Sequence, residues 1–474
     1  MRRTLIILLV ALVIAVSALD AVSPASAGHA AYWQRLPIVR RGYRPPEPCF
    51  PAYGGYEFLF SVNADYDVHE AFPTRGDFNA DGRDDILITR LKYQTYTSYA
   101  LDILLSDGSG GMRLATSDLF SGPVPVVQHP AMVVIADFNA DGCSDIFVAD
   151  TGYDDNPFPG YQNTLVLSTP GGRLVDARQN LPQQQDSSHS AAAADIDGDG
   201  DIDLYVGNMW ARNMINPQIL LNDGRGRFTL AENRLPPLVD LSQNGYTVCA
   251  FCDVNNDGFP DLILGDAGDD IDLSHEYTTR TSEVLLNDGR GEFTWLRGAL
   301  PPKDSSPYDK TNDIKPIELN GDGFMDLLIV YQGQPSGISY TQALINNQNG
   351  TFRNETALRM GSYDRQPWNG WFTTSGVGRP PLELQDVDRD GDLDVWGRNW
   401  DTPHPEPLLL VNDGSGVFRH QPFSLGLREG SLYFTFIDLE GDGGHDVLLT
   451  LNYPPDHVFV IRDVGCRATT AAGW

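Results

Sequence analysis

The sequence is poor in cysteine and in positive charge, and it has one long hydrophobic run. Five cysteines and nine histidines are scattered over 474 residues, and Cys249 and Cys252, which are spaced as CxxC, have no second pair for a zinc site. No Ser-His-Asp, HExxH or similar pattern predicts a catalytic centre. Lysine and arginine number 33 against 64 acidic residues, which gives a formal net charge of −31. This acidic balance argues against nucleic acid and anionic membranes as partners.

The hydrophobic run lies at the N-terminus and has the features of a secretory signal. Arg2 and Arg3 precede the apolar segment Leu5–Val16, and Ala25 to Ala27 form a cleavage signal before Gly28. The run is shorter than a transmembrane span, and no second candidate follows it. The sequence predicts a signal peptide at residues 1–27 and a protein that is secreted or held at the cell surface, without membrane insertion after cleavage. An uncleaved anchor is the alternative.

What the sequence has in abundance is a nine-residue acidic motif, Asp-x-Asn/Asp-x-Asp-Gly-x-x-Asp. It occurs seven times, with start-to-start spacings of 52 to 68 residues, a period typical of repeat architectures. The copies are DFNADGRDD from Asp77, DFNADGCSD from Asp137, DIDGDGDID from Asp195, DVNNDGFPD from Asp253, ELNGDGFMD from Glu318, DVDRDGDLD from Asp386 and DLEGDGGHD from Asp438. Seven repeats are enough to close a ring.

The invariant positions of the motif indicate calcium. Positions five and nine are always Asp, position six is always Gly, and positions one and three hold only Asp, Glu or Asn. Glycine permits the positive φ of a sharp turn on which these side chains converge, and hard oxygen ligands suit Ca²⁺. Position twelve is never Glu, which excludes an EF-hand. Asp/Asn/Gly turns without a metal are the alternative.

We therefore predict up to seven bound Ca²⁺ ions, held by positions one, three, five and nine of each copy. The predicted ligands are Asp77, Asn79, Asp81, Asp85, Asp137, Asn139, Asp141, Asp145, Asp195, Asp197, Asp199, Asp203, Asp253, Asn255, Asp257, Asp261, Glu318, Asn320, Asp322, Asp326, Asp386, Asp388, Asp390, Asp394, Asp438, Glu440, Asp442 and Asp446. Because exposed carboxylates at this density repel one another, folding should depend on the metal.

The residues around the motif predict β-strands. Position two and the positions after the motif are apolar, as expected for strands covered on both faces. Downstream segments such as LLNDGRGRF from Leu220 and LVNDGSGVF from Leu410 indicate β-hairpins. Each repeat would then hold four strands, and the expected fold is all-β: a seven-bladed β-propeller of four-stranded antiparallel blades with calcium-binding loops.

On these motifs the chain resembles the FG-GAP or VCBS repeat proteins, the integrin-α-like propellers, over residues 50 to 466. The resemblance implies a seven-bladed propeller with Ca²⁺ in the loop between the first two strands of a blade. Glu318 and Glu440 depart from the family pattern, because each places a longer side chain where Asp or Asn is usual.

The last repeat lacks a fourth strand, so we expect the segment Tyr56–Ser61 to complete it. The predicted organisation is a lead-in at residues 28–55, the propeller at 56–466 and a tail at 467–474. Ring closure would bring Cys49 near Cys466, which suggests a disulfide between them. Cys143 lies in an acidic motif, and we interpret Cys249 and Cys252, on a strand that enters another motif, as buried thiols.

Long aromatic loops are expected on the propeller face opposite the motifs, where stacking on sugars or protein contacts would suit them. Their aromatic and histidine residues are Tyr93, Tyr96, Tyr99, Tyr153, Phe158, Tyr161, Trp210, His275, Tyr277, Trp368, Trp371, Trp396, Trp400 and His404. Packing of these rings between blades is the plainer alternative.

The function predicted is that of a monomeric, secreted calcium-binding module for adhesion to an extracellular glycan or protein, since integrin-like propellers and propeller lectins of the wider family bind ligands. One alternative is a lyase-like, polysaccharide-active enzyme, for which His189 and His275 are the candidate bases. A purely structural surface scaffold is the other. Whether the protein has any enzymatic activity stays open at this point.

Overall fold

The strands of the protein form four-stranded antiparallel sheets arranged as the blades of a β-propeller. The computed structural model describes residues 57–63, 70–92, 96–153, 158–209, 215–237, 245–268, 282–333, 339–361, 382–399, 406–421, 432–441, 445–451 and 456–461. The chain divides into two units, Met1–Pro37 and Ile38–Trp474. Everything below concerns the second unit, since the first lies outside the described residues.

The first three blades each use one continuous stretch of chain. Blade one consists of β2 (Glu70–Gly76), β3 (Asp85–Leu91), β5 (Asp102–Ser106) and β6 (Met112–Leu114). Blade two consists of β8 (Pro130–Ala136), β9 (Asp145–Asp150), β10 (Thr164–Thr169) and β11 (Arg173–Asp176). Blade three consists of β12 (Ser188–Ala194), β13 (Asp203–Asn208), β14 (Gln218–Asn222) and β15 (Phe228–Ala231).

The next three blades repeat this pattern. Blade four consists of β16 (Tyr246–Cys252), β17 (Asp261–Asp266), β18 (Glu283–Asn287) and β19 (Phe293–Trp295). Blade five consists of β20 (Lys310–Ile317), β21 (Asp326–Gln332), β22 (Ser339–Asn346) and β23 (Phe352–Asn354). Blade six consists of β24 (Leu382–Gln385), β25 (Asp394–Asn399), β26 (Glu406–Asn412) and β27 (Phe418–Gln421).

A further four-stranded sheet, here called the closing sheet, joins distant parts of the chain. Its strand order is β28 (Leu432–Ile437), β29 (Asp446–Leu451), β30 (Asp456–Ile461) and β1 (Glu57–Asn63). β1 pairs with β30 in antiparallel register, for example Phe58 opposite Phe459. The expectation that an N-terminal segment completes the last repeat is therefore confirmed. Among the described residues there are six blades, not the seven that the repeat count predicted, because the strands around the seventh acidic motif pair with an N-terminal strand in this composite sheet and not with a fourth strand of their own.

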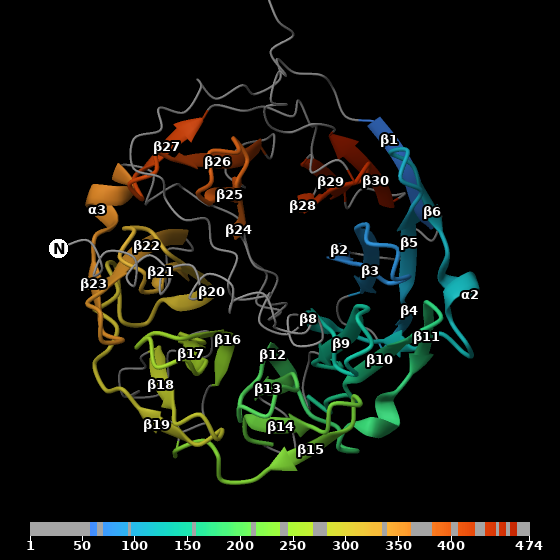
Figure 1. Ribbon diagram of the computed structural model, residues 1–474, viewed down its shortest axis with the longest axis horizontal. Helices are drawn as coiled ribbons and strands as arrows, with labels where there is room; N and C mark the ends of the chain where they lie inside the picture. Colours follow the sequence, from blue (N-terminus) through green and yellow to red (C-terminus); the bar gives the residue numbers. More distant parts are fainter. Residues whose placement is uncertain are drawn as a thin grey trace, which may run out of the picture. The chain divides into compact units, whose positions relative to one another are not determined.

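Short elements connect the blades. The pair β4 (Tyr99–Ala100) and β7 (Val126–Val127) forms a two-stranded sheet beside blade one. Single turns of helix, α2 (Thr116–Leu119), η1 (Arg178–Asn180) and α3 (Thr356–Arg359), follow the outer strands of blades one, two and five. Figure 1 shows the sheets succeeding one another around a ring, with the first strand of each of the six blades, and β28 of the closing sheet, on the inside. In the described part of the chain, no helix has the length and apolar character needed to cross a membrane.

The hydrophobic core is divided into clusters that lie between neighbouring sheets. One cluster joins Leu87 of blade one to Val148 of blade two, and others continue around the ring. Between the closing sheet and blade one, Ile86 packs with Leu448 and Val460. Position two of the acidic motif is buried in all seven copies, and in six of them it belongs to one of these clusters. The uniformly buried β3, β9, β13, β17 and β21 confirm that the second strands are covered on both faces.

Candidate metal-binding loops and the opposite face

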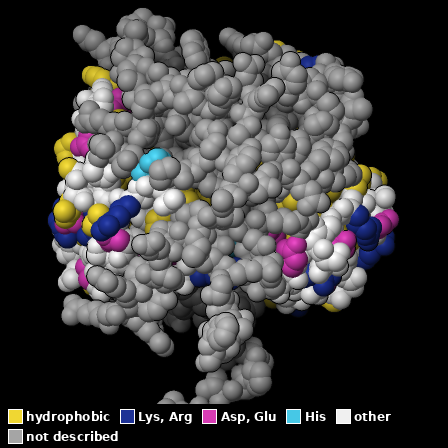
Figure 2. Space-filling view, turned by 90° about the horizontal axis from the view of Figure 1, so that it is seen from above, with side chains coloured by type: hydrophobic (Ala, Val, Ile, Leu, Met, Phe, Trp, Pro, Cys, Tyr) yellow, Lys and Arg dark blue, Asp and Glu magenta, His cyan; other side chains and the backbone are white. Residues whose placement is uncertain are grey.

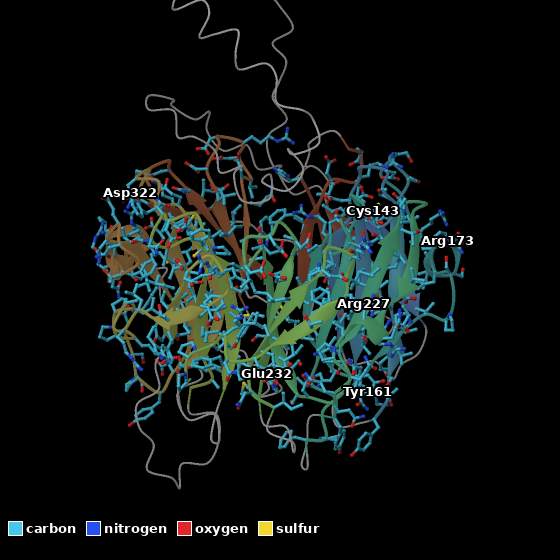
Figure 3. The ribbon with its side chains drawn as sticks, turned by 60° about the horizontal axis from the view of Figure 1, so that its bottom comes forward. Cys143, Tyr161, Arg173, Arg227, Glu232 and Asp322 are labelled. Atoms are coloured by element: carbon cyan, nitrogen blue, oxygen red, sulfur yellow. The ribbon has the colours of Figure 1, made fainter. Side chains whose placement is uncertain are left out.

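Each acidic motif forms the loop between the first and second strands of a sheet, and we call these segments acidic loops one to seven. They span Asp77–Asp85, Asp137–Asp145, Asp195–Asp203, Asp253–Asp261, Glu318–Asp326, Asp386–Asp394 and Asp438–Asp446, of which residues 442–444 lie outside the described residues. In Figure 3, Cys143 of loop two and Asp322 of loop five lie toward one end of the sheets, whereas Tyr161 and Glu232 lie toward the other. The acidic loops thus share one face of the propeller.

The aspartate at position nine ties each loop to its blade. One of its carboxylate oxygens accepts the backbone N–H of position two in all seven loops, as in Ile196 to Asp203 at 3.0 Å. The other oxygen accepts a backbone N–H at the end of the third strand in blades one to six, as in Asn222 to Asp203 at 2.8 Å. This residue therefore fixes the geometry of the loop, a role that the sequence did not suggest.

In each of loops one to six, the turn is made by two residues with positive φ, whereas position six of loop seven lies outside the described residues. Position six is one of them, as predicted for its glycine: φ is 80° at Gly82 and 102° at Gly391. Position four is the other, and the sequence analysis missed it, because Ala, Asn and Arg occupy it in loops one, two, four and six. The signal was present in the glycines that fill the same position in loops three, five and seven. These two kinks turn the acidic side chains inward.

The carboxylates inside the turn accept backbone N–H groups. In loop two, the N–H of Asp141 donates to Asp137 at 3.1 Å and to Asn139 at 3.0 Å, and the N–H of Gly142 donates to Asp137 at 2.8 Å. Loops one and four repeat this pattern of bonds. These loops therefore have a defined conformation, held by backbone N–H bonds to the side chains of positions one and three.

Two loops bring three carboxylates together. In loop three, one oxygen each of Asp195, Asp197 and Asp203 lie within 4.8 Å of one another, and Asp386, Asp388 and Asp394 do the same in loop six. Positions one, three and nine thus lie close together in these two loops, while Asp199 and Asp390 at position five, also among the predicted ligands, stand outside the two groups. Loops one, two, four and five carry Asn at position three, so their corresponding sets combine carboxylates with an amide oxygen.

The donor set fits a hard cation. Carboxylate oxygens can only accept hydrogen bonds when ionised. In the described part of the structure, Asp141 Oδ2, Asp197 Oδ1 and Asp392 Oδ1 are buried without a hydrogen-bond partner. Such oxygens are costly to bury unless a cation balances them. A calcium ion, which prefers six to eight oxygen ligands, would satisfy them and leave the backbone bonds intact.

Burial raises the pKa of the position-nine carboxyls above their ordinary value, even though the backbone N–H bonds lower it. Neighbouring carboxylates of the same loop raise it further. The resulting pKa is about 6 for Asp326, about 7 for Asp85, Asp145, Asp203 and Asp261, and about 8 for Asp394. In loop six, burial and the charge of Asp390 also raise the pKa of Asp388 and Asp392.

Neighbouring loops are also linked to each other. The side-chain amide of Asn222 in blade three donates to the backbone oxygen of Phe138 in loop two at 2.7 Å. Asn287 and Asn346 make the same bond to Ile196 and Val254. These asparagines are the Asn of the LxNDG hairpin motif, which the sequence analysis assigned to a turn only. The link runs from the third strand of one blade to the acidic loop of the preceding blade.

Several other predicted residues take structural roles. Cys143, Cys249 and Cys252 are buried free thiols, and burial raises the pKa of Cys143 to about 11. Cys249 and Cys252 belong to hydrophobic clusters on opposite faces of β16, so they do not form a pair. The proposed partners Cys49 and Cys466 lie outside the described residues, as do the signal peptide, the lead-in and the tail.

His189 and Trp396 are parts of the core. His189 lies on β12 with no exposed surface, and burial lowers its pKa to about 3, so it cannot reach a substrate as a base. Trp396 was expected in a loop on the opposite face. That expectation is wrong: Trp396 lies on β25, fully buried, with its ring 5.2 Å from Phe436 of the closing sheet. The second candidate base, His275, lies outside the described residues.

Of the aromatic residues predicted for the opposite face, the described ones other than Trp396 gather over blades one and two. Tyr96 is 64% exposed and stacks on Tyr153, with ring centroids 4.0 Å apart and an interplanar angle of 16°. Phe158 and Tyr161 are half-buried, and Tyr99 lies on β4. The remaining loop residues of the predicted set, Tyr93, Trp210, Tyr277, Trp368, Trp371, Trp400 and His404, lie outside the described residues.

Comparison with known proteins supports the repeat assignment. Residues 77–148 and 137–206 match the family model of the FG-GAP-like repeat. No curated protein sequence matches this chain. Together with the strand arrangement, the family match shows an all-β propeller with FG-GAP-like repeats.

Three solved structures illustrate the likeness. The V. cholerae biofilm matrix protein Bap1 is 12% identical with a TM-score of 0.36, and the alignment covers 89% of this chain and 92% of that one. A PL25 ulvan lyase is 11% identical with a TM-score of 0.47, covering 88% and 97%. A mutant of AofleA from Arthrobotrys oligospora is 9% identical with a TM-score of 0.41, covering 83% and 94%.

Proposed function

We propose that the protein is a secreted calcium-binding propeller that acts as a binding or adhesion module for an extracellular glycan or protein. The observation that carries the metal part is the convergence of carboxylate oxygens within 4.8 Å in loops three and six. An ion bound there supplies the positive charge that lets these buried carboxylates remain ionised. The chain's own groups at positions one, three and nine would hold it, with the backbone bonds of position nine fixing their spacing.

The secreted location rests on the signal-like N-terminus and on the chemistry of the metal. Calcium modules that work outside the cell bind at millimolar levels, which the extracellular medium supplies. The binding role rests on the scaffold: rigid blades hold loops on the face opposite the acidic loops, and an exposed tyrosine stack is found there. His189, the described candidate for a catalytic base, is buried, so nothing in the described residues favours the enzyme alternative.

Metal removal tests the proposal. The purified protein is unfolded by heat with millimolar Ca²⁺ and with excess chelator, and bound ions are counted by native mass spectrometry. We expect several ions per chain and a large drop in the melting temperature on chelation, because the uncompensated carboxylates then destabilise the fold. An unchanged melting temperature together with no bound metal would refute the calcium proposal.

A variant pair assigns the ions to the loops. Asp388→Ala removes one carboxylate of the loop-six group and should reduce the ion count by one. Asp413→Ala is the matched control, since Asp413 lies in the hairpin turn of the same blade and pairs with Arg419 at 3.0 Å. It should leave the ion count unchanged. If both variants bind the same number of ions, loop six is not one of the calcium sites.

A further inference from the structure

The stacked pair Tyr96 and Tyr153 is the most exposed aromatic feature of the described structure. The rings lie 4.0 Å apart and nearly parallel, and Tyr96 nevertheless keeps 64% of its surface exposed. One face of the Tyr96 ring is covered by Tyr153. Because the side chain is still this exposed, its other face is open to solvent. We propose that this pair, here called the tyrosine platform, binds a neutral sugar ring by stacking. The proposal deepens the binding function above and rests on it.

The platform is built across two blades. Tyr96 lies between β3 and β5 of blade one, and Tyr153 lies between β9 and β10 of blade two. Both segments join the second and third strands of their blades, so they occur on the face opposite the acidic loops. The hydrophobic cluster between blades one and two packs the two sheets from which these segments extend against each other.

The backbone next to Tyr153 is held tightly. The carboxylate of Asp150 accepts the N–H groups of Gln128, His129 and Gly152 at 2.7 to 2.9 Å. A Cβ at Gly152 would come within 2.6 Å of the backbone of Gly160. Tyr153 therefore follows a residue, Gly152, whose backbone is held in place. This reduces the conformational entropy that is lost when a ligand binds.

Backbone strain marks the same segment. Phe158 has φ of 49°, a left-handed conformation that is unfavourable for a bulky aromatic residue. The following Gly160 also has positive φ, and a Cβ there would come within 2.6 Å of the backbone of Asp186. Strain of this kind tends to persist where a local conformation serves binding. The strain at Phe158 is independent of the ring stack and lies in the same loop as Tyr153.

The surroundings favour a sugar over a protein partner. A stable protein interface buries about 800 Å² on each side around a cluster of apolar anchors. The exposed large hydrophobic side chains of the described residues are instead dispersed. They are Tyr96, Leu114, Leu230, Phe259, Tyr308 and Leu358, spread over blades one, three, four and five and their connections. A single exposed ring face suits the apolar face of one pyranose.

The net charge of the chain favours neutral sugars over anionic ones as ligands. The chain carries a formal net charge of −31, so its field repels polysaccharides that contain uronate or sulfate groups. On the flank seen in Figure 2, described basic side chains lie beside acidic ones. The geometry therefore points to a neutral hexose in a polysaccharide or glycan.

Affinity electrophoresis with the calcium-loaded protein tests the platform. The gels contain a β-1,4-glucan, a β-1,3-glucan, a galactan, a mannan or, for comparison, polygalacturonate. The variants are Tyr96→Ala, Tyr96→Phe and the control Tyr308→Ala. Tyr308 is 42% exposed and lies on the same face, between β19 and β20. Melting temperatures are compared for all variants, since a substitution at an exposed ring should leave folding unchanged.

We expect retardation by at least one neutral polysaccharide, a loss of affinity of about tenfold in Tyr96→Ala, and near-normal affinity in Tyr96→Phe and Tyr308→Ala. If the unaltered protein binds a neutral polysaccharide and Tyr96→Ala binds it equally well, the platform is refuted and the binding function stands. Retardation by polygalacturonate alone refutes the neutral-sugar assignment. If no polysaccharide retards the protein, both the platform and the glycan part of the proposed function are refuted. The proposed function then reduces to the binding of a protein.

Discussion

At the scale of single residues, the acidic loops depend on backbone conformation as much as on charge. The positive φ of position six follows from an invariant glycine and could be predicted. Position four has the same requirement, but Ala80, Ala140, Asn256 and Arg389 occupy it in four loops, and a residue with a Cβ gives no sequence signal for positive φ. Likewise, the hairpin asparagine was predicted to shape a turn, whereas Asn222 also reaches the neighbouring loop. That contact depends on how blades pack, which no local pattern encodes.

Loop two allows the cost of this strain to be measured. Ala140 and Gly142 both have positive φ, 58° and 87°. Ala140→Gly should raise the free energy of unfolding by about 1 kcal/mol, because a left-handed alanine is strained by more than the extra unfolded-state entropy of glycine costs. The reverse change, Gly142→Ala, should lower it by about 1 kcal/mol, since a Cβ there meets no atom within 4 Å and the penalty is only in the backbone.

Chemical denaturation of calcium-loaded protein gives both values. The two variants exchange the same side-chain atoms within one loop, so each serves as the control of the other. Shifts of the same sign in both variants would contradict the strain argument.

At the scale of structural elements, the loop and the strand that follows it form one electrostatic unit. Each second strand begins with the position-nine aspartate, and in blades one to six its two oxygens accept backbone N–H groups from the acidic loop and from the third strand, as Asp203 does. The sequence predicted the strands, their burial and the loop between them, since these follow from apolar runs and invariant Asp and Gly. It did not predict that position nine is a buried support, because metal ligation and backbone capping select the same residue type.

The raised pKa values predict an unusual pH dependence for metal-free protein. The pKa of Asp85, Asp203 and Asp261 in the folded state is about 7, compared with an ordinary value of 3.8. Between these values the folded state binds more protons than the unfolded state, so the free energy of unfolding should fall as pH rises from about 5 to about 7. Saturating calcium should reverse the trend, because protons then compete with the ion.

Denaturant titrations at several pH values, with chelator and with calcium, check this prediction. The calcium-loaded series is the control for titration of groups outside the loops. A chelated protein that becomes more stable from pH 5 to pH 7 would show that the position-nine carboxyls are ionised without help from a cation.

At the scale of the whole molecule, the composite sheet makes the ring continuous. The side chain of Thr450 donates to the backbone oxygen of Ala71 at 2.8 Å, and the N–H of Asp438 donates to Asp84 at 3.1 Å. The latter contact links loop seven to loop one, as the bond between Asp77 and Ser144 links loop one to loop two. A missing strand at one end and a spare apolar segment at the other were sufficient to predict this closure. The tyrosine platform was not predictable as a pair, because its rings come from different blades.

Closure can be tested with a matched pair of core substitutions. Val460 on β30 and Val284 on β18 occupy equivalent positions in the third strands of their sheets. Val460 pairs with Leu448 and Val284 pairs with Ile263, and both valines are buried. Val460→Asp should lower the free energy of unfolding by about 4 kcal/mol, since it buries an unpaired carboxylate. Hydrogen exchange should accelerate first in the closing sheet and blade one, which share its cluster. Val284→Asp should instead affect blades four and five.

Hydrogen exchange followed by mass spectrometry locates these effects in each blade. If Val460→Asp leaves the exchange of β2 and β3 unchanged, blade one does not depend on the closing sheet, and the ring is not mechanically continuous there.

The pairing of β1 with β30 also sets an order for biosynthesis. β1 ends at Asn63 and β30 begins at Asp456, so β1 is made long before the strand it pairs with. Until then its backbone N–H and C=O groups have no partner in a sheet, and an exposed strand edge is prone to pairing with other chains. Repeats in the middle can assemble while the chain is still being made, but the ring can close only after β30 has emerged. A ribosome that stalls before that point would release a chain with two open edges, and quality control of this protein should be most active on such products.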